Sequence, residues 1–255
     1  MQYDPIKDKA AALISIFPML RKFFYAAMNM LLLRQRYVFR EIRQYAKDDL
    51  KFYDAGAGFC QYSHYVLKHY PQARVFATDL KADYLSSFAH QTPERFSYQS
   101  ADLQYFTPKY HYDMAIAIDI LEHIEQDVSA IRNISKALKS GGIFIVSTPS
   151  DTDEAARFTG EHVRPGYNKA ELESKLINCD FNILKSTYTY GRFGALSWRL
   201  MLKYPLQWLS KGKAFVIFLP FWYLGIYPIS ELLMRLDMSI SKNSGTGILI
   251  VAKKI

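Results

Sequence analysis

The middle of the chain alternates short apolar runs with segments of helical spacing. The runs predicted to be strands are 51–55, 73–79, 95–102, 114–119, 143–149, 181–190 and 247–254. Segments between them, such as 126–142, place apolar residues three or four positions apart, which predicts helices. The helix in 126–142 is expected to end at Gly141 and Gly142, since glycine commonly follows a last helical turn. This alternation predicts a doubly wound, Rossmann-like α/β sheet with helices on both faces.

Two parts of the chain depart from this pattern. Residues 1–50 are predicted to be an N-terminal helical segment, and the core is predicted to run over 51–190. Residues 191–243 are interpreted as a hydrophobic, basic insertion before the last core strand in 244–255. The insertion contains an uncharged run, 214–230, which two prolines and a glycine divide. A bilayer crossing takes about 20 continuous apolar residues, so an interfacial or re-entrant helical segment is expected.

The distribution of charge bears on what this insertion contacts. The net charge is +8, and residues 10–47 hold seven Lys/Arg against one acid, while 191–243 hold seven against two. Both segments are also rich in aromatic and aliphatic residues. Basic and apolar composition together favours an anionic membrane surface as partner, and no nucleic acid is expected. A lid over the active site or a dimer contact is the alternative, and the oligomeric state is left open.

The cysteines and the N-terminus bear on the compartment. Cys60 and Cys179 show no paired spacing, which favours a reducing compartment and argues against a structural zinc site. The first residues contain acids and a proline where a secretion signal has a basic start and an apolar run. We expect a cytoplasmic protein that is peripheral on the cytoplasmic face of a membrane.

Polar residues follow four of the predicted strands. The strand 51–55 leads into Gly56 and Gly58, and glycine allows backbone to approach a ligand closely. Asp79 follows the next strand, 21 residues after Gly58, where an acid is suited to hold ribose hydroxyls. Asp102 and Asp119 follow two further strands. Ligands of such sheets bind at the carboxyl ends of the strands, so these residues are expected to meet at one site.

Taken together, these motifs resemble the class I S-adenosylmethionine-dependent methyltransferases, and within them the ubiquinone-biosynthesis O-methyltransferase group. The resemblance covers roughly residues 50–190 and the last strand, and it rests on FYDAGAGFC, VFATDL, SADLQYF, YDMAIAIDILEHI, LKSGGIFIVSTP and EHVRPGYNKAEL. It implies a seven-stranded sheet whose last strand is antiparallel, and S-adenosyl-L-methionine as cofactor. The implied cofactor-binding residues are Asp54, Gly56, Gly58, Asp79, Leu80, Asp102, Leu103, Asp119 and Ile120.

One position departs from the family pattern. Cys60 stands where the family usually has a third glycine. Cysteine is small, so cofactor binding is expected to survive. A reactive thiol of low pKa is one interpretation of Cys60, and a small buried side chain is the one we favour.

The implied reaction is direct methyl transfer from a sulfonium to a nucleophile, in which alignment supplies much of the rate. A hydroxyl acceptor also needs a base, and His123 and His162 are the candidates, oriented by Glu122 and Glu161. His123 could equally cap a helix. Glu161, Arg164 and Tyr167 are predicted to bind the acceptor, or to shape their loop. No metal is expected.

The functional hypothesis is methylation, most readily on oxygen, of a lipophilic small molecule at a membrane surface. An NAD-dependent oxidoreductase is one alternative, although its G-x-G-x-x-G fingerprint needs glycine at position 61, where Gln61 stands. Base methyltransferases carry a different element after the fourth strand. A non-catalytic, membrane-bound binding module of the same fold is the remaining alternative.

Overall fold

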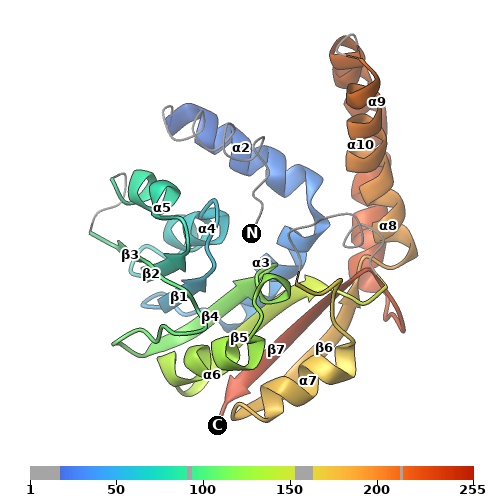
Figure 1. Cartoon of the computed structure of the whole chain (residues 1–255). Coiled ribbons are helices and arrows are strands. Elements are labelled where there is room, and N and C mark those ends of the chain that lie inside the picture. The colour runs from blue at the N-terminus through green and yellow to red at the C-terminus, as the bar shows by residue number, and fades with distance from the viewer. Residues whose placement is uncertain (1–17, 91–93, 153–162, 213–214) are drawn as a thin grey trace.

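The computed structural model describes residues 18–90, 94–152, 163–212 and 215–255. It contains a seven-stranded sheet in the order β3-β2-β1-β4-β5-β7-β6 (Figure 1). Strand β7 runs antiparallel to both of its neighbours, β5 and β6, and the other neighbouring pairs of these strands are parallel. The strands are β1 Lys51–Ala55, β2 Arg74–Asp79, β3 Phe96–Ser100, β4 Tyr112–Ile118, β5 Leu138–Pro149, β6 Phe181–Thr189 and β7 Gly247–Lys254. The predicted fold class, including the antiparallel last strand, is confirmed.

Helices cover both faces of the sheet. One face carries α3 Leu33–Tyr45, α4 Gln61–His69 and α5 Ala82–Ala89, and the other carries α6 Asp127–Ala137 and α7 Lys169–Ile177 (Figure 1). The further helices are α2 Pro18–Leu31, the short 3₁₀ turn η1 Leu121–His123, α8 Arg192–Trp198, the π-helix η3 Arg199–Lys203, α9 Tyr204–Lys211 and α10 Phe215–Ser239. This arrangement has three layers, with the sheet in the middle.

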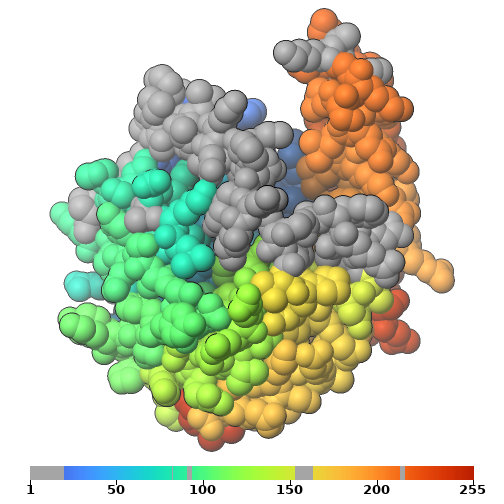
Figure 2. Space-filling view, viewed as in Figure 1, coloured from blue at the N-terminus to red at the C-terminus, as the bar shows by residue number. Residues whose placement is uncertain are grey.

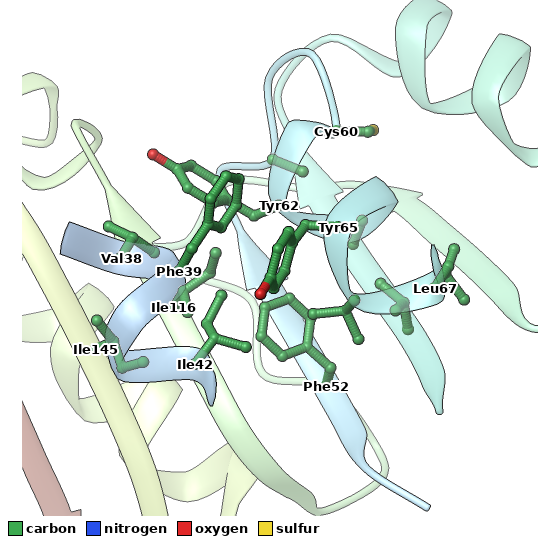
Figure 3. Close-up of a cluster of buried hydrophobic side chains, with 14 of the residues drawn as sticks. Val38, Phe39, Ile42, Phe52, Cys60, Tyr62, Tyr65, Leu67, Ile116 and Ile145 are labelled. Carbon is green, nitrogen blue, oxygen red and sulfur yellow. The ribbon is translucent and has the colours of Figure 1, made fainter. Parts of the chain in front are cut away.

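The central strands are apolar along their whole length because each face is covered. In β4, Met114 and Ile116 pack into the core on the α3–α4 side, while Ala115 and Ala117 pack into the core on the α6 side. Successive side chains of a strand point to opposite faces, so an uninterrupted apolar run is what a doubly covered strand requires. Figure 3 shows the first of these cores, where side chains of α3, β1, α4 and β4 meet.

The predicted end of the helix in 126–142 is wrong by four residues. Helix α6 ends at Ala137, and β5 already begins at Leu138. Leu138 is buried and pairs with Tyr112 of β4, ahead of a register shift before Met114. Gly141 lies within β5 with a φ of +78°, so this glycine serves an irregular strand instead of ending a helix.

The insertion also differs from the expectation, because its uncharged run belongs to one continuous helix. Helix α10 has 25 residues and passes through Pro220 and Pro228. Each proline removes an N–H donor and brings its ring against the carbonyl four residues earlier, so contacts elsewhere have to support the helix. The indole N–H of Trp222 donates to the carbonyl of Leu200 (3.0 Å), and the Tyr223 hydroxyl donates to the carbonyl of Met201 (3.0 Å). Both carbonyls lie in η3, so these bonds hold α10 against the preceding helical run. The resulting α8–α10 hairpin stands out from the body of the protein (Figures 1 and 2).

The base of this hairpin is fixed to the core by Asp237 near the end of α10. Its carboxylate is buried and accepts hydrogen bonds from the Tyr37 hydroxyl of α3 (2.8 Å) and from the backbone N–H of Gly194 in α8 (3.0 Å). Lys242 lies 3.6 Å from the same carboxylate. One side chain therefore joins α3, α8 and α10.

We predict that Asp237→Ala lowers the free energy of unfolding by about 3 kcal/mol, because it leaves buried donors without their charged acceptor. Denaturant titration measures this change. The control is Glu171→Ala on α7, whose exposed carboxylate pairs with Lys175 (2.8 Å) and whose loss should cost less than about 0.5 kcal/mol. Equal effects of the two substitutions would show that Asp237 does not anchor the hairpin.

Candidate active site

A cavity of about 420 Å³ lies at the carboxyl ends of the central strands, and we call it the strand-end cavity. Eight of the nine residues predicted to bind the cofactor line it: Gly56, Gly58, Asp79, Leu80, Asp102, Leu103, Asp119 and Ile120. These residues follow four different strands, and the sheet order brings them together. Their roles stay predictions, but their common location is a property of the structure.

The turn after β1 depends on its two glycines in different ways. Gly56 has a φ of +80°, and a Cβ added there would lie 2.5 Å from Cγ1 of Ile120. Gly58 also has a positive φ, +48°, but a Cβ there would meet no atom within 4 Å. The backbone N–H groups of Gly56 and Ala57 both donate to the carbonyl of Thr78 (2.8 and 2.9 Å). The turn is thus hydrogen-bonded to β2 on one side and packs against Ile120 on the other.

Asp79 ends β2 and holds a fixed carboxylate at the cavity. One oxygen accepts the N–H of Gly58 (2.9 Å), and the other accepts the N–H of Lys81 (3.1 Å). Each carboxylate oxygen has a second lone pair, so Asp79 retains capacity for the hydroxyls of a bound ribose. Asp102 is held in a similar way by the N–H of Gln104 (2.9 Å).

Asp54 does not line the cavity, contrary to its predicted role as a cofactor contact. Its side chain is buried beneath the turn and accepts a hydrogen bond from the Ser63 hydroxyl of α4 (2.6 Å). Burial raises the pKa of Asp54 to about 7. The residue ties the end of β1 to α4, and so supports the glycine turn from behind.

Asp119 forms an ion pair that the sequence did not predict. It has a φ of +50° and forms an ion pair with Arg34 of α3, which also lines the cavity. Burial opposes the charge of Arg34, but Asp119, acting together with Tyr190, Tyr62 and Glu122, holds the pKa of Arg34 above its ordinary value. Sequence reasoning missed Arg34, together with Met28, Leu32 and Gln35 from the same N-terminal helices. No local pattern links these residues to a strand end far along the chain.

Cys60 occupies a left-handed position, with a φ of +56°, just before α4. This backbone conformation favours glycine, which accounts for the glycine that the family usually has there. The side chain is fully buried, and burial raises the pKa of its thiol. These features support the interpretation of Cys60 as a small buried side chain.

His123 of η1 lines the strand-end cavity, which leaves its predicted role as a base open to test. Glu122, its proposed orienting partner, is buried and accepts a hydrogen bond from the Thr148 hydroxyl of β5 (3.0 Å). Burial and the nearby Asp119 raise the pKa of Glu122 to about 8. The second candidate base, His162, and the predicted acceptor contact Glu161 lie outside the described residues.

Arg164 and Tyr167 do not line the cavity, so their predicted contact with the acceptor is not supported. The Arg164 guanidinium donates to the carbonyls of Leu121 (2.8 Å) and Ile124 (2.9 Å). The hydroxyl of Tyr167 is buried and donates to the carboxylate of Asp127 (2.6 Å). Both residues hold the turn that carries His123, which matches the alternative interpretation that they shape their loop.

The cavity fits S-adenosylmethionine in size and chemistry. Its volume lies within the range of small-molecule sites, roughly 300–1,000 Å³. Asp79 offers acceptors for hydroxyls, Leu80, Leu103 and Ile120 offer apolar surface for an aromatic ring, and the space above Gly58 is open. Carboxylates of the lining also suit a cationic sulfonium.

Comparison with known proteins agrees with this site. Residues 53–144 match the family model of a methyltransferase domain. The fold is that of a class I methyltransferase. A solved S-adenosylmethionine-dependent methyltransferase from Mesorhizobium loti superposes with a TM-score of 0.55 and 18% identity, covering 84% of this chain and 96% of that one. Coclaurine N-methyltransferase, solved with N-methylheliamine and S-adenosylhomocysteine, gives a TM-score of 0.55 and 16% identity, covering 84% of this chain and 68% of that one.

A curated relative matches over a shorter stretch. Trans-aconitate 2-methyltransferase of Azoarcus sp. (strain BH72) is 26% identical over 101 residues. The match covers 40% of this chain and 40% of that protein's length. It therefore supports the methyltransferase domain and leaves the acceptor open. The assignment to the ubiquinone-biosynthesis group stays a prediction.

We predict that Gly56→Ala destabilises the protein by about 2 kcal/mol more than Gly58→Ala does, since overpacking against Ile120 adds to a left-handed strain that both variants share. Guanidinium denaturation of the two variants measures the difference. Gly58→Ala serves as the matched control because its Cβ points into open space. If both variants lose the same stability, the close approach of Gly56 to Ile120 is not what requires glycine.

Proposed function

We propose that this protein is an S-adenosylmethionine-dependent methyltransferase that acts on a lipophilic small molecule at a membrane surface. The observation that carries the enzyme assignment is the set of eight predicted cofactor residues along one cavity, inside the segment that matches a methyltransferase domain. The oxidoreductase alternative is not favoured. Gln61 lines the cavity at the position where the dinucleotide fingerprint needs glycine.

S-adenosylmethionine, when bound, supplies a methyl group activated by a sulfonium. Asp79 would accept hydrogen bonds from the ribose hydroxyls, and Leu80 and Leu103 would pack against the adenine. The Gly56 and Gly58 turn leaves room for the methionine portion. For a hydroxyl acceptor, an imidazole nitrogen of His123 would take the proton that the acceptor loses. Oxygen as the methylated atom is part of the proposal.

We expect Asp79→Ala to weaken S-adenosylmethionine binding at least about tenfold, roughly 1.4 kcal/mol, because the ribose contact and the support of the Gly58 N–H are both lost. Isothermal titration calorimetry measures this affinity. The control is Asp83→Ala, an exposed acid on α5 that does not line the cavity, and it should bind as the wild type does. An unchanged affinity in Asp79→Ala would refute the cofactor site. Mass spectrometry of lipid and aqueous extracts, read for the added methyl group, then identifies the acceptor.

The membrane part of the proposal is supported by the surface of α10. Among the described residues, α10 is the one helix long and apolar enough to cross a membrane by length and composition, and 6% of that apolar stretch is buried. Its side chains Ile217, Phe221 and Leu224 are 76%, 69% and 79% exposed. An exposed apolar surface of this kind on a projecting element is typical of contact with lipid or another apolar partner.

The charges of the hairpin favour an interfacial position over a spanning one. The helical run paired with α10 carries Arg192, Arg199, Lys203 and Lys211. Cations within the hydrocarbon core are costly, whereas at the headgroup level they attract anionic lipids. The hairpin would therefore lie in the interface, with the apolar face of α10 toward the acyl chains.

We predict that the double substitution Phe221→Asp and Leu224→Asp abolishes flotation with anionic vesicles at low salt, because two charges enter the apolar face. The control is Ile177→Asp at the end of α7, another exposed aliphatic residue, which should leave flotation intact. Flotation that persists in the α10 variant, or that is missing in the wild type, would reject the docking proposal and leave the enzyme assignment standing.

A further inference from the structure

A second cavity, of about 960 Å³, lies among α2, α3, α4 and α10. We call it the basic cavity, because its lining holds five lysines and arginines against a single glutamate, Glu231. The cations are Lys22, Arg36, Arg43, Lys68 and Arg235. With the two lining histidines neutral, the lining has a net charge of +4.

We propose that the basic cavity binds the phosphate group of the methyl acceptor, an anionic amphiphile. The proposal rests on the proposed function, since it names the chemistry of the acceptor. At neutral pH a phosphate monoester carries close to two negative charges, and a phosphodiester headgroup carries one. Either anion can accept hydrogen bonds from several converging cations at once. Arginine, which supplies three of the five cations here, binds phosphate oxygens through two parallel N–H groups.

Internal pairing does not satisfy these cations. Glu231 pairs with both Arg36 (2.7 Å) and Arg235 (2.8 Å), so one carboxylate serves two guanidinium groups. Within the described residues, no carboxylate forms an ion pair with Lys22, Arg43 or Lys68. The cavity therefore retains positive charge that an anionic ligand can neutralise.

The pKa of His64, on the wall of the basic cavity, depends on burial and on the surrounding cations. Burial is the larger influence, and the neighbouring cations Lys68, Arg21 and Lys22 act in the same direction; together with His69 they lower the pKa of His64 to about 4. The imidazole ring of His64 packs against the Tyr25 ring at a centroid distance of 4.6 Å. A bound anion would offset the cations and raise the pKa of His64.

An independent observation comes from Gln35, which lines both the basic cavity and the strand-end cavity. This side chain is 2% exposed, and its Nε2 has no hydrogen-bond partner among the described residues. Gln61 also lines both cavities, and its Oε1 is likewise buried without a partner there. A buried polar atom without a partner is unfavourable, so these two amides point to a ligand that forms the missing hydrogen bonds.

The two glutamines also place the ligand relative to the methyl donor. They form a shared wall, so a phosphate in the basic cavity holds the rest of its molecule next to the strand-end cavity. The N–H₂ of Gln35 would donate to a phosphate oxygen, and the Oε1 of Gln61 would accept from a hydroxyl of the same molecule. Tyr227 and Met238 of α10 add apolar surface to the same lining, adjacent to the helix that we propose meets lipid.

The test is an NMR titration of His64 in the full chain, in chloride and with glycerol 3-phosphate at matched ionic strength. A second arm uses vesicles of phosphatidylglycerol against vesicles of phosphatidylcholine. The pKa of His64 should rise by about one unit when the phosphate ligand binds, because its negative charge stabilises the imidazolium. One unit corresponds to 1.36 kcal/mol of differential interaction. A response to glycerol 3-phosphate identifies a soluble phosphate as sufficient, and a response to phosphatidylglycerol alone identifies a lipid headgroup.

Variants make the outcome decisive. The double substitution Lys22→Gln and Lys68→Gln should weaken the phosphate response at least about tenfold, as the loss of charge-assisted contacts predicts. Lys136→Gln on α6 is the control, because this exposed lysine does not line the cavity. No response from either ligand, or equal responses in the two variants, overturns the proposal. Calorimetry with S-adenosylmethionine is independent of this readout, so failure of the cofactor site and failure of the phosphate site are distinguishable.

Discussion

The close contact between the turn after β1 and Ile120 after β4 is the constraint on which the candidate site depends. Gly56 meets Ile120 where no side chain would fit, and the same turn is bonded to the Thr78 carbonyl of β2. These contacts hold the ends of three neighbouring strands in one arrangement. Asp79 then completes the turn by accepting the Gly58 N–H. The cavity is a consequence of this local geometry together with the sheet order.

The N-terminal helices α2 and α3 also contribute to the candidate site. Leu33, Val38 and Ile42 of α3 are buried in the core that also contains β1 and α4. The same helix presents Arg34 to Asp119 and places Gln35 between the two cavities. A segment that composition alone suggested as a membrane contact therefore supplies one wall of the site. Its basic side chains therefore also line the two cavities: Arg34 pairs with Asp119 at the strand-end cavity, and Arg36 and Arg43 line the basic cavity.

Much of the fold was predictable because apolar strands covered on both faces leave a clear pattern, as in β4 and β5. Five of the strand-end positions were predictable because parallel strands end at one edge: Gly56, Gly58, Asp79, Asp102 and Asp119. Contacts between residues far apart in the sequence could not be predicted in this way. Asp54 turns inward to Ser63, and Arg164 and Tyr167 serve a buried network, which depends on the packing of separate elements. A helical insertion was predicted, but the continuity of α10 was not, because its prolines indicated a break and its bonds to η3 join separate elements.

The attachment of the hairpin to α3 has a mechanical consequence. Asp237 of α10 is bonded to Tyr37, and Tyr37 lies less than one helical turn from Arg34 and Gln35 on the same rigid helix. Tilting of the hairpin relative to the body would either break that buried bond or move α3 together with the hairpin. A displacement at the outer end of the hairpin thus reaches the wall shared by the two cavities through the contacts of α10 with α3, which include the Asp237–Tyr37 bond and the Arg36–Glu231 ion pair.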